Sequence, residues 1–227
     1  MSNIIPFTNL YKQDAAICLA SAFINDPVLG QHMFRQDAYK ASGATTFFSS
    51  VVDEQFNKTK HSCVATDKNG TLQGVCLWQG PNEPKGVSLG SMIRMLPLAP
   101  SIFGYSHIWR VLTGNAAVDG NHPTYKHYYL AYIGVSPNCQ GQGIGSALLK
   151  PVLKKADAQG IPCYLETGNP KNIGFYEKHG FVLTNEIVVM NKSEVAVGDA
   201  PKGAPLLIYC MKRESTKRRT RKSTPRH

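Results

Sequence analysis

Several signals that would define other classes of protein are missing from this sequence of 227 residues. No apolar stretch reaches the roughly 18 to 20 residues that a membrane-spanning helix needs. The N-terminus lacks the basic start and apolar block of a secretory signal. The six cysteines are scattered, without the C-x-x-C spacing of a zinc or redox site. These absences favour a cytoplasmic protein that needs no metal and whose cysteines are small buried apolar residues.

Net positive charge is also small over most of the chain, although the net charge of the whole is +10. Residues 212–227 hold eight Lys or Arg residues against one Glu, which leaves a net charge of only +3 for the rest. We expect one domain over residues 1–213, followed by a basic, disordered tail over residues 214–227, because the tail has no apolar side chains to bury. Such a tail could bind nucleic acid or another anionic surface, act as a nuclear address, or only improve solubility.

Apolar periodicity indicates an α/β domain with a mixed sheet. Helical spacing is found over Tyr11–Ile24 and again between Phe47 and Phe56. The stretch 62–78 predicts two strands joined by a turn at Asn69-Gly70. Residues 80–126 carry the weakest pattern, and we expect helices and loops there that line a pocket.

The second half of the chain predicts alternating strands and helices. A helix is expected from Ile144 to Gly160, with Pro151 inside it, and a short helix between Asn169-Pro170 and Gly180. Strands are expected at residues 127–135, 161–167, 181–190 and 205–211.

Three glycines lie within five positions at the start of the helix that begins at Ile144, in the stretch QGQGIG. Glycine weakens a helix that it enters. We therefore interpret these residues as a loop whose main-chain N–H groups can approach a phosphate at the positive end of the helix dipole; the alternative is a plain tight turn. A Walker A loop would need a lysine after Gly145, and the dinucleotide fingerprint would need glycine in place of Ser146.

The remaining pattern, Gln140-x-x-Gly143-x-Gly145, resembles the pyrophosphate-binding signature of the GNAT superfamily of acyl-CoA N-acyltransferases, Q/R-x-x-G-x-G/A. The surrounding YIGVSPNCQGQGIGSALLK and the later LETGNP and NIGFYEKHGF resemble the core of that family, and most of all the puromycin N-acetyltransferase type. The resemblance covers most of residues 4–213. It implies the GNAT fold, a mixed and mostly antiparallel central sheet flanked by helices, with splayed central strands.

The resemblance also implies acetyl-CoA as the cosubstrate and no metal. The pantetheine arm would pair with the main chain of the strand that ends at Val135, where Gly134 would leave room, and the pyrophosphate would bind the following loop. Asn172 would contact the pantetheine arm, or else only support the start of its helix. The cofactor-binding residues implied in this way are Ile133, Gly134, Val135, Gln140, Gly141, Gln142, Gly143, Gly145, Ser146 and Asn172.

Two residues are implied as catalytic. Tyr176 matches the position whose hydroxyl donates to the departing thiolate, since a phenol is protonated at neutral pH; it could instead fill a helix–sheet contact. Glu166 matches a carboxylate near the reaction site, either the base that deprotonates the amine or a structural acceptor. Some relatives carry a glutamate where Tyr129 stands here, and further candidates for the base are His122, His127 and His179.

The implied function is an acetyl-CoA-dependent N-acetyltransferase, in which a primary amine of a small molecule attacks the thioester directly. Two alternatives stay open. The acceptor could be a protein or peptide amine, or the chain could be a non-catalytic CoA-binding module with a basic tail that binds nucleic acid.

Overall fold

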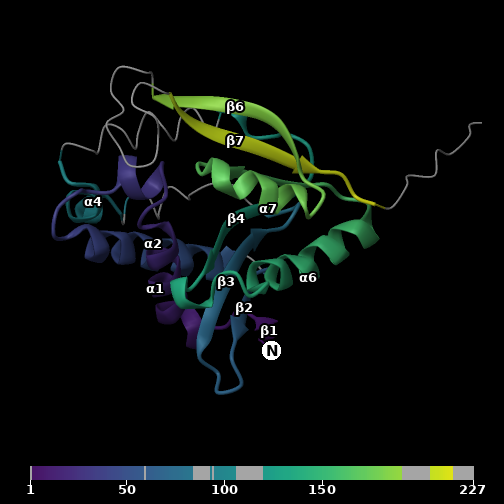
Figure 1. Ribbon diagram of the computed structural model, residues 1–227, viewed down its shortest axis with the longest axis horizontal. Coiled ribbons are helices and arrows are strands. Elements are labelled where there is room, and N and C mark those ends of the chain that lie inside the picture. The colour runs from purple at the N-terminus through teal and green to yellow at the C-terminus, as the bar shows by residue number, and fades with distance from the viewer. Residues whose placement is uncertain are drawn as a thin grey trace, which may run out of the picture.

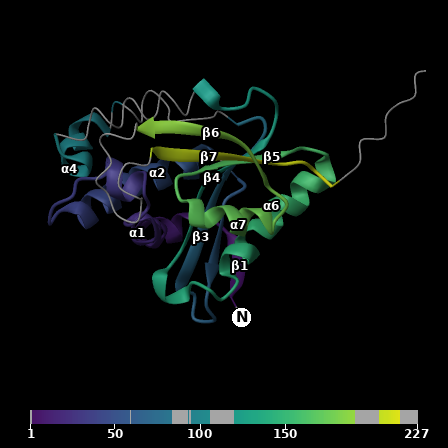
Figure 2. The ribbon, with the colours of Figure 1, turned by 45° about the horizontal axis from the view of Figure 1, so that its top comes forward.

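The computed structural model describes residues 2–58, 60–83, 93, 95–105, 120–190 and 205–216. Its centre is a seven-stranded sheet in the order β1-β2-β3-β4-β5-β7-β6, with helices on both faces (Figure 1 and Figure 2). All neighbouring strands are antiparallel except β4 and β5. The strands are β1 (Asn3–Pro6), β2 (Cys63–Thr66), β3 (Leu72–Gln79), β4 (Tyr128–Val135), β5 (Cys163–Thr167), β6 (Val182–Met190) and β7 (Leu206–Arg213). The predicted mixed, mostly antiparallel sheet is confirmed.

The helices that the sequence predicts are all present, although α2 begins at Lys40, seven residues before the apolar spacing that predicted it. Gly160 ends the helix predicted from Ile144, with a φ of 70°, and Asn169 accepts a hydrogen bond from the N–H of Lys171 at the start of the following short helices. The strand β1 and the π-helical turn η2 were not predicted. The α-helices are α1 (Lys12–Phe23), α2 (Lys40–Lys58), α4 (Ala99–Phe103), α6 (Ile144–Gln159) and α7 (Ile173–Glu177); the short turns are η1 (Asn9–Tyr11), η2 (Leu29–Met33), η3 (Leu96–Leu98), η4 (Pro137–Cys139) and η5 (Pro170–Asn172).

Alternation along the strands divides the core into two layers. On β4, Tyr128 and Leu130 face the layer under α6 and α7, whereas Tyr129 and Tyr132 face the layer under α1 and α2. Both layers are well filled, since Leu148 on α6 and Leu19 on α1 are fully buried. Pro151 lies on the exposed face of α6, where it interrupts no core contact. The sheet is therefore a rigid platform that presents different side chains on its two faces.

The central strands β4 and β5 separate within the sheet. β4 and β5 pair only from Tyr128↔Cys163 to Leu130↔Leu165. Beyond this point β4 pairs with β3 alone and β5 with β7 alone. The register of β4 on β3 also shifts between Leu77 and Trp78, so Ala131 is an extra residue at the point of separation. The predicted splay of the central strands is confirmed, and we call the space between the two strands the fork.

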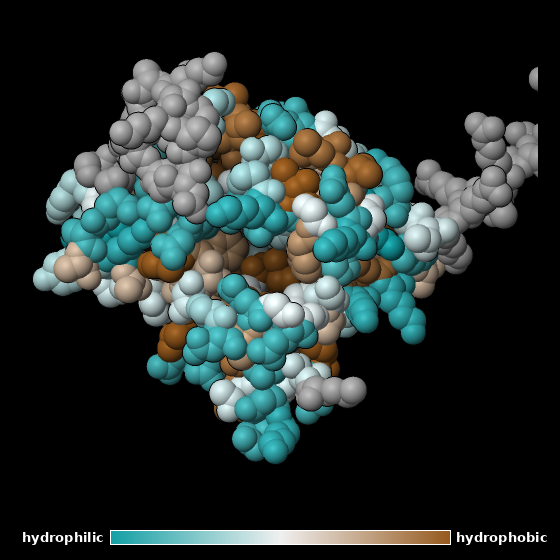
Figure 3. All heavy atoms as spheres, viewed as in Figure 1, coloured by the Kyte–Doolittle hydropathy of each residue, from teal (hydrophilic) through white to brown (hydrophobic). Residues whose placement is uncertain are grey.

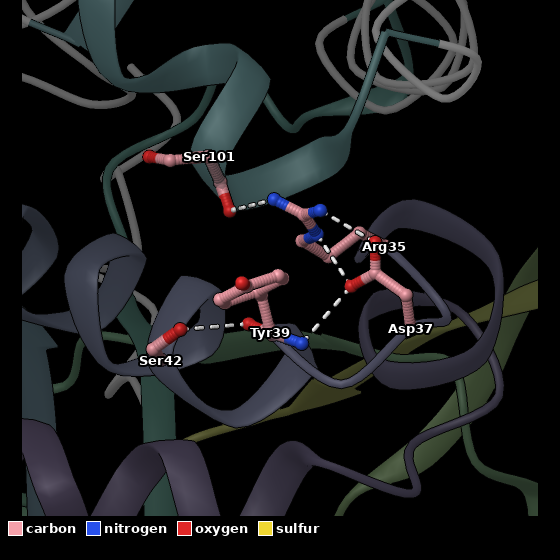
Figure 4. A network of polar contacts seen from close by, with 5 residues as sticks. All are labelled: Arg35, Asp37, Tyr39, Ser42 and Ser101. Atoms are coloured by element: carbon pink, nitrogen blue, oxygen red, sulfur yellow. Dashed lines mark hydrogen bonds and ion pairs between the residues drawn. The ribbon is translucent and has the colours of Figure 1, made fainter.

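A polar network fixes α4 against the start of α2 (Figure 4). Arg35 forms an ion pair with Asp37 and donates to the main-chain oxygen of Ser101 on α4. Asp37 also accepts the N–H of Tyr39, whose ring lies 5.0 Å from the Arg35 guanidinium carbon. The hydrogen bonds from Arg35 lower the pKa of Asp37, so the network is intact at neutral pH. It fixes α4, which belongs to the 80–126 stretch; within that stretch residues 84–92, 94 and 106–119 lie outside the described residues.

The cysteines are small buried residues, as predicted. Five of the six cysteines are buried, Cys139 is half-buried, and all are free thiols. Within the described part of the chain, no helix has the length and apolar character to cross a membrane.

Candidate active site

The glycine loop is a turn that ends in the helix N-terminus. Gly141 and Gly143 have φ values of 74° and 78°, in the left-handed region that residues with a Cβ rarely adopt. Gly143 is the N-cap of α6. Gly145 has a different reason, because an added Cβ would lie 3.2 Å from the ring of Phe175 on α7. The three glycines therefore serve both the backbone turn and the contact between two helices.

Main-chain donors converge at this turn. None of the six N–H groups from Gly141 to Ser146 donates a hydrogen bond to another described residue, whereas the N–H of Ala147 already bonds Gly143. The side chains turn away from the turn, because Gln140 donates to the main-chain oxygen of Val135 at 3.1 Å and Gln142 to that of Asn138 at 3.3 Å. Six free donors at the positive end of a 16-residue helix fit a pyrophosphate.

The strand that leads into the loop offers a second set of main-chain groups. The N–H of Ser136 bonds the oxygen of Gln73 on the β3 side. Because successive residues of a strand point their main-chain groups to opposite sides, those of Ile133 and Val135 point into the fork. This placement suits pairing with an extended pantetheine arm.

The reason expected for Gly134 is wrong. A Cβ at this position would lie 3.0 Å from Leu19 and 3.1 Å from Ala22, both on α1. The glycine therefore makes room for the helix that covers the sheet, not for the pantetheine arm.

Asn172 lies at the end of β5. Its side-chain amide is 3.5 Å from the hydroxyl of Thr167, which also accepts the N–H of Asn169 at 3.3 Å. Asn172 is the N-cap of α7 without a side-chain capping bond. Its amide is thus held near the fork rather than used to start the helix.

Tyr176 lies in the layer under α6 and α7, and only 5 % of its surface is exposed. Its ring packs against Phe175 and Phe181, so the predicted packing role is real. Its hydroxyl makes no hydrogen bond to another described residue. Burial raises the pKa of this phenol well above its usual value, so it remains a proton donor throughout the neutral range.

Glu166 lies on the other face of the sheet, one residue beyond the last pairing of β4 with β5. Its side chain is 8 % exposed. Oε1 is 3.2 Å from Nδ1 of His122, while Oε2 is buried and has no hydrogen-bond partner among the described residues. The hydroxyls of Tyr129 and Tyr164 act on the same carboxylate, and a cationic donor at Oε2 would complete its hydrogen bonding.

Aromatic residues enclose this carboxylate on the α1 and α2 face. Tyr129 and Tyr164 are paired across β4 and β5, and their rings lie 6.3 Å apart. Burial, and then the negative charge of Glu166, raises the pKa of Tyr129 far above its usual value and that of Tyr132 to about 12. The pKa of Tyr164 is raised for the same two reasons. All three phenols are therefore neutral at physiological pH.

The candidate histidines separate into two groups. His122 and His127 lie together, with their Nε2 atoms 3.2 Å apart and His122 next to Glu166. His179 lies by α7, where its Nδ1 bonds the main-chain oxygen of Phe175 at 2.8 Å. The structure thus groups two of the three candidates with the carboxylate.

A pocket of about 350 Å³ adjoins the histidines and the end of the sheet. His127 packs against two of its lining residues, since its ring centroid is 5.4 Å from that of Tyr125 and 5.6 Å from that of Tyr164. Separately, Figure 3 shows hydrophobic side chains at the floor of a hollow where Figure 1 places β4 and α7. The pocket is lined by Asn121, Pro123, Tyr125, Tyr164, Thr184, Asn185, Cys210 and Lys212.

Sequence reasoning missed the segment that closes one end of the fork. Asp26 accepts the N–H groups of Val28 and Leu29 and starts η2. Val28 packs so closely on the residue after β5 that a Cβ at Gly168 would lie 2.4 Å from it. An Asp whose carboxylate can accept the N–H groups two and three residues later is a capping signal, and this signal could have indicated the turn from the sequence.

Comparison with known proteins identifies the family. The model of the acetyltransferase (GNAT) family matches residues 31–181, and the chain therefore belongs to this family. An uncharacterized N-acetyltransferase of Schizosaccharomyces pombe is 25% identical over 197 residues, which are 81% of this chain and 75% of that protein.

Solved structures show the same fold. A protein described as histone acetyltransferase HPA2 and related acetyltransferase, from Corynebacterium glutamicum, has a TM-score of 0.64 at 23% identity and covers 94% of this chain and 96% of its own. Arylalkylamine N-acetyltransferase 2 of Aedes aegypti has a TM-score of 0.60 at 13% identity, over 94% and 98%. At these identities the likeness concerns the fold, while acetyl transfer follows from the family.

Proposed function

We propose that the chain transfers an acetyl group from acetyl-CoA to a primary amine of a small molecule, and that it is of the puromycin N-acetyltransferase type. The observation that carries the proposal is the fork between β4 and β5, with six free N–H groups at its mouth and a buried, half-partnered carboxylate at its apex.

The chain holds its cosubstrate mainly with main-chain groups. N–H groups from Gly141 to Ser146 bind the pyrophosphate, and the main chain of Ile133 and Val135 pairs with the pantetheine arm. The amide of Asn172 lies beside the same path. Bound acetyl-CoA supplies an acyl group already activated as a thioester, so the protein contributes chiefly positioning and proton transfer.

Proton transfer uses the two faces of the sheet. Glu166 takes the proton of the acceptor ammonium at Oε2, on the α1 and α2 face, which frees the nitrogen lone pair. The nitrogen forms a bond to the acetyl carbon and loses its second proton to solvent, and the bond from that carbon to sulfur breaks. Tyr176 donates its proton to the departing thiolate from the opposite layer. Solvent then returns a proton to Tyr176 and removes one from Glu166.

The side chains around Glu166 favour an acceptor whose amine is attached to a flat or apolar body. The carboxylate that would meet the ammonium is enclosed by the rings of Tyr129, Tyr132 and Tyr164. Aromatic rings attract a cation through their faces, and the pocket of about 350 Å³ that Tyr164 also lines is of the size of small-molecule sites.

The first experiment measures release of the free CoA thiol from acetyl-CoA with puromycin as acceptor, against the same mixture without acceptor. Release that depends on puromycin supports both the reaction and the subtype. Release equal to the control rejects the puromycin subtype, and a panel of arylalkylamines, polyamines and lysine peptides then identifies the acceptor class. No release with any amine, together with no binding of CoA in calorimetry, would reject the proposal that the chain is an acetyltransferase.

The basic tail is proposed as an accessory to this activity. A chain that ends at Thr216 keeps the hydrogen bond from its N–H to Asp157 on α6 and lacks residues 217–227. We expect unchanged turnover from this variant and weaker retention on a nucleic-acid or heparin column, because it loses most of the tail's positive charge. Loss of turnover would instead place the tail in the acceptor site.

A further inference from the structure

We propose that Glu166, His122 and His127 share one extra proton and act as a single unit that receives the proton of the acceptor amine. This inference rests on the proposed function, in which Glu166 is the base, and it adds His122 and His127 as positioning residues. It follows from a chain of three contacts that ends on a main-chain oxygen.

The chain of contacts is continuous. His127 Nδ1 is 2.6 Å from the main-chain oxygen of Tyr125, and His127 Nε2 is 3.2 Å from His122 Nε2. His122 Nδ1 is 3.2 Å from Glu166 Oε1. The His127 residue is 1 % exposed, so water does not replace these partners.

The number of protons in this series of contacts is fixed by the carbonyl oxygen at one end, that of Tyr125. A carbonyl oxygen only accepts, so His127 carries a proton on Nδ1. Each of the other two contacts also needs one proton between its two atoms. Two neutral imidazoles bring two protons for three contacts. The third proton lies between His122 and Glu166, either on the imidazole or on the carboxyl, and the three side chains together carry no net charge.

The free oxygen of Glu166 is where the acceptor enters this unit. Oε1 is engaged with His122, whereas Oε2 is buried and without a partner among the described residues. An ammonium group at Oε2 supplies the missing donor. When its proton moves to Oε2, the proton at Oε1 is held by His122 Nδ1, and the positive charge spreads over the two imidazoles through their Nε2 contact. One N–H bond of the ammonium breaks and one O–H bond forms, so charge and atoms balance.

The phenols around the unit are neutral, and those of Tyr129 and Tyr164 act on Glu166 as hydrogen-bond donors. Burial keeps the nearby phenols and the thiol of Cys210 in their neutral forms, because it raises the pKa of each. Glu54 on α2 acts on Tyr132, and the ammonium of Lys212 lies 4.7 Å from the Tyr125 ring centre. The titratable or charged groups that face the unit are thus Tyr129 and Tyr132 from β4, Tyr164 from β5, Cys210 and Lys212 from β7, Glu54 from α2, and Tyr125.

The net charge of variants tests the shared proton without any substrate. We compare the full chain with Glu166→Gln and with Glu186→Gln, an exposed carboxyl on β6, by native capillary electrophoresis at pH 7.5. Glu186→Gln raises the net charge by one. Glu166→Gln is expected to leave it unchanged, because the variant gives up the shared proton together with the carboxylate charge. A rise of one with Glu166→Gln would overturn the proposal.

A variant of His122 tests the shared proton by removing the imidazole instead of the carboxylate. His122→Asn keeps an amide donor toward Oε1 and removes the titrating ring, so the net charge is expected to fall by one. His179→Asn is the matched control, because His179 Nδ1 bonds the main-chain oxygen of Phe175 at 2.8 Å and the ring faces no carboxylate among the described residues. No change of charge in His122→Asn, as in the control, would contradict the shared proton.

The pH profile of kcat/KM separates positioning from mere packing. With puromycin, or the amine that the panel selects, His122→Asn is expected to move the acid limb toward lower pH, because the carboxylate no longer shares the extra proton. The KM for acetyl-CoA is expected to stay the same. An unmoved acid limb would reject the role of His122, whereas full turnover of Glu166→Gln would reject the proposed base while the charge measurement still decides on the shared proton.

Discussion

The two ends of the fork between β4 and β5 present different chemical groups, main-chain groups at one end and side chains at the other. The mouth of the fork, at the glycine loop, presents main-chain N–H groups, and its side chains bond back to the main chain. The apex presents side chains, a carboxylate, two imidazoles and three phenols, gathered from β4, β5 and the segment before β4. Main-chain recognition tolerates side-chain change, whereas the apex depends on each functional group. Substitutions should therefore act by different routes at the two ends.

The largest effect is expected at the apex. Glu166→Gln should lower kcat by about 10²–10⁴, the range of general base catalysis, while the KM for acetyl-CoA stays unchanged because the amide keeps the shape of the carboxyl. Stopped assays of thiol release over a range of amine concentrations measure both constants. Glu186→Gln, in an exposed position of β6, serves as the control. A full kcat in Glu166→Gln would mean that the amine loses its proton elsewhere.

Tyr176→Phe should lower kcat by about 10² through loss of the proton donor, with the packing of the ring retained. Burial raises the pKa of Tyr176 above its usual value, so its proton is present below that pKa and lost only above it; activity should not decline through this group up to about pH 9. Tyr128→Phe is the control, because Tyr128 is buried in the same layer and donates only to Gln159. Equal kcat in the two variants would leave Tyr176 with a packing role.

The mouth of the fork should respond more weakly and in affinity. Gly143→Ala places a Cβ at a φ of 78° at the start of α6, and Gly160→Ala places one at 70° at the end of the same helix. Each should cost about 1–2 kcal/mol of unfolding free energy. Only Gly143→Ala should weaken CoA binding in calorimetry, by about tenfold, because only that turn aims N–H groups at the pyrophosphate. Equal CoA affinities would remove the loop from the binding site.

The smallest effect concerns the scaffold that both ends share. Arg213 forms two hydrogen bonds with Asp157 on α6, at 2.9 and 2.8 Å, and lowers the pKa of that carboxyl. A carboxyl whose pKa is lower in the folded state stabilises the fold above about pH 3.9, and the contribution disappears as the pH falls. Asp157→Asn should cost about 1 kcal/mol in urea unfolding at pH 7, and the difference should shrink as the pH falls below about 3.9. A difference that stays constant over this pH range would mean that packing, not charge, is lost.

The same division explains what the sequence could predict. The strand, the glycine loop and the helix follow one another without a break from Tyr128 to Gln159, so β4, the loop and α6 could be predicted together. Tyr176 could be assigned only through the family resemblance. The contact of His122 with Glu166 joins residues 44 positions apart, and no local pattern predicts it. Gly134 shows the opposite error, since its spacing suggested a ligand and its neighbours on α1 show a packing constraint.

The strand order has a consequence for how the chain folds. β7 lies between β5 and β6, although it is the last strand along the chain. Until β7 is made and inserted, both of its neighbours expose an unpaired edge, and β6 carries exposed Val182, Leu183 and Val188. Unpaired apolar edges invite association between nascent chains. A chain interrupted before Leu206 would therefore retain the glycine loop but leave β6 without a partner and β5 with an open edge, both exposed to aggregation.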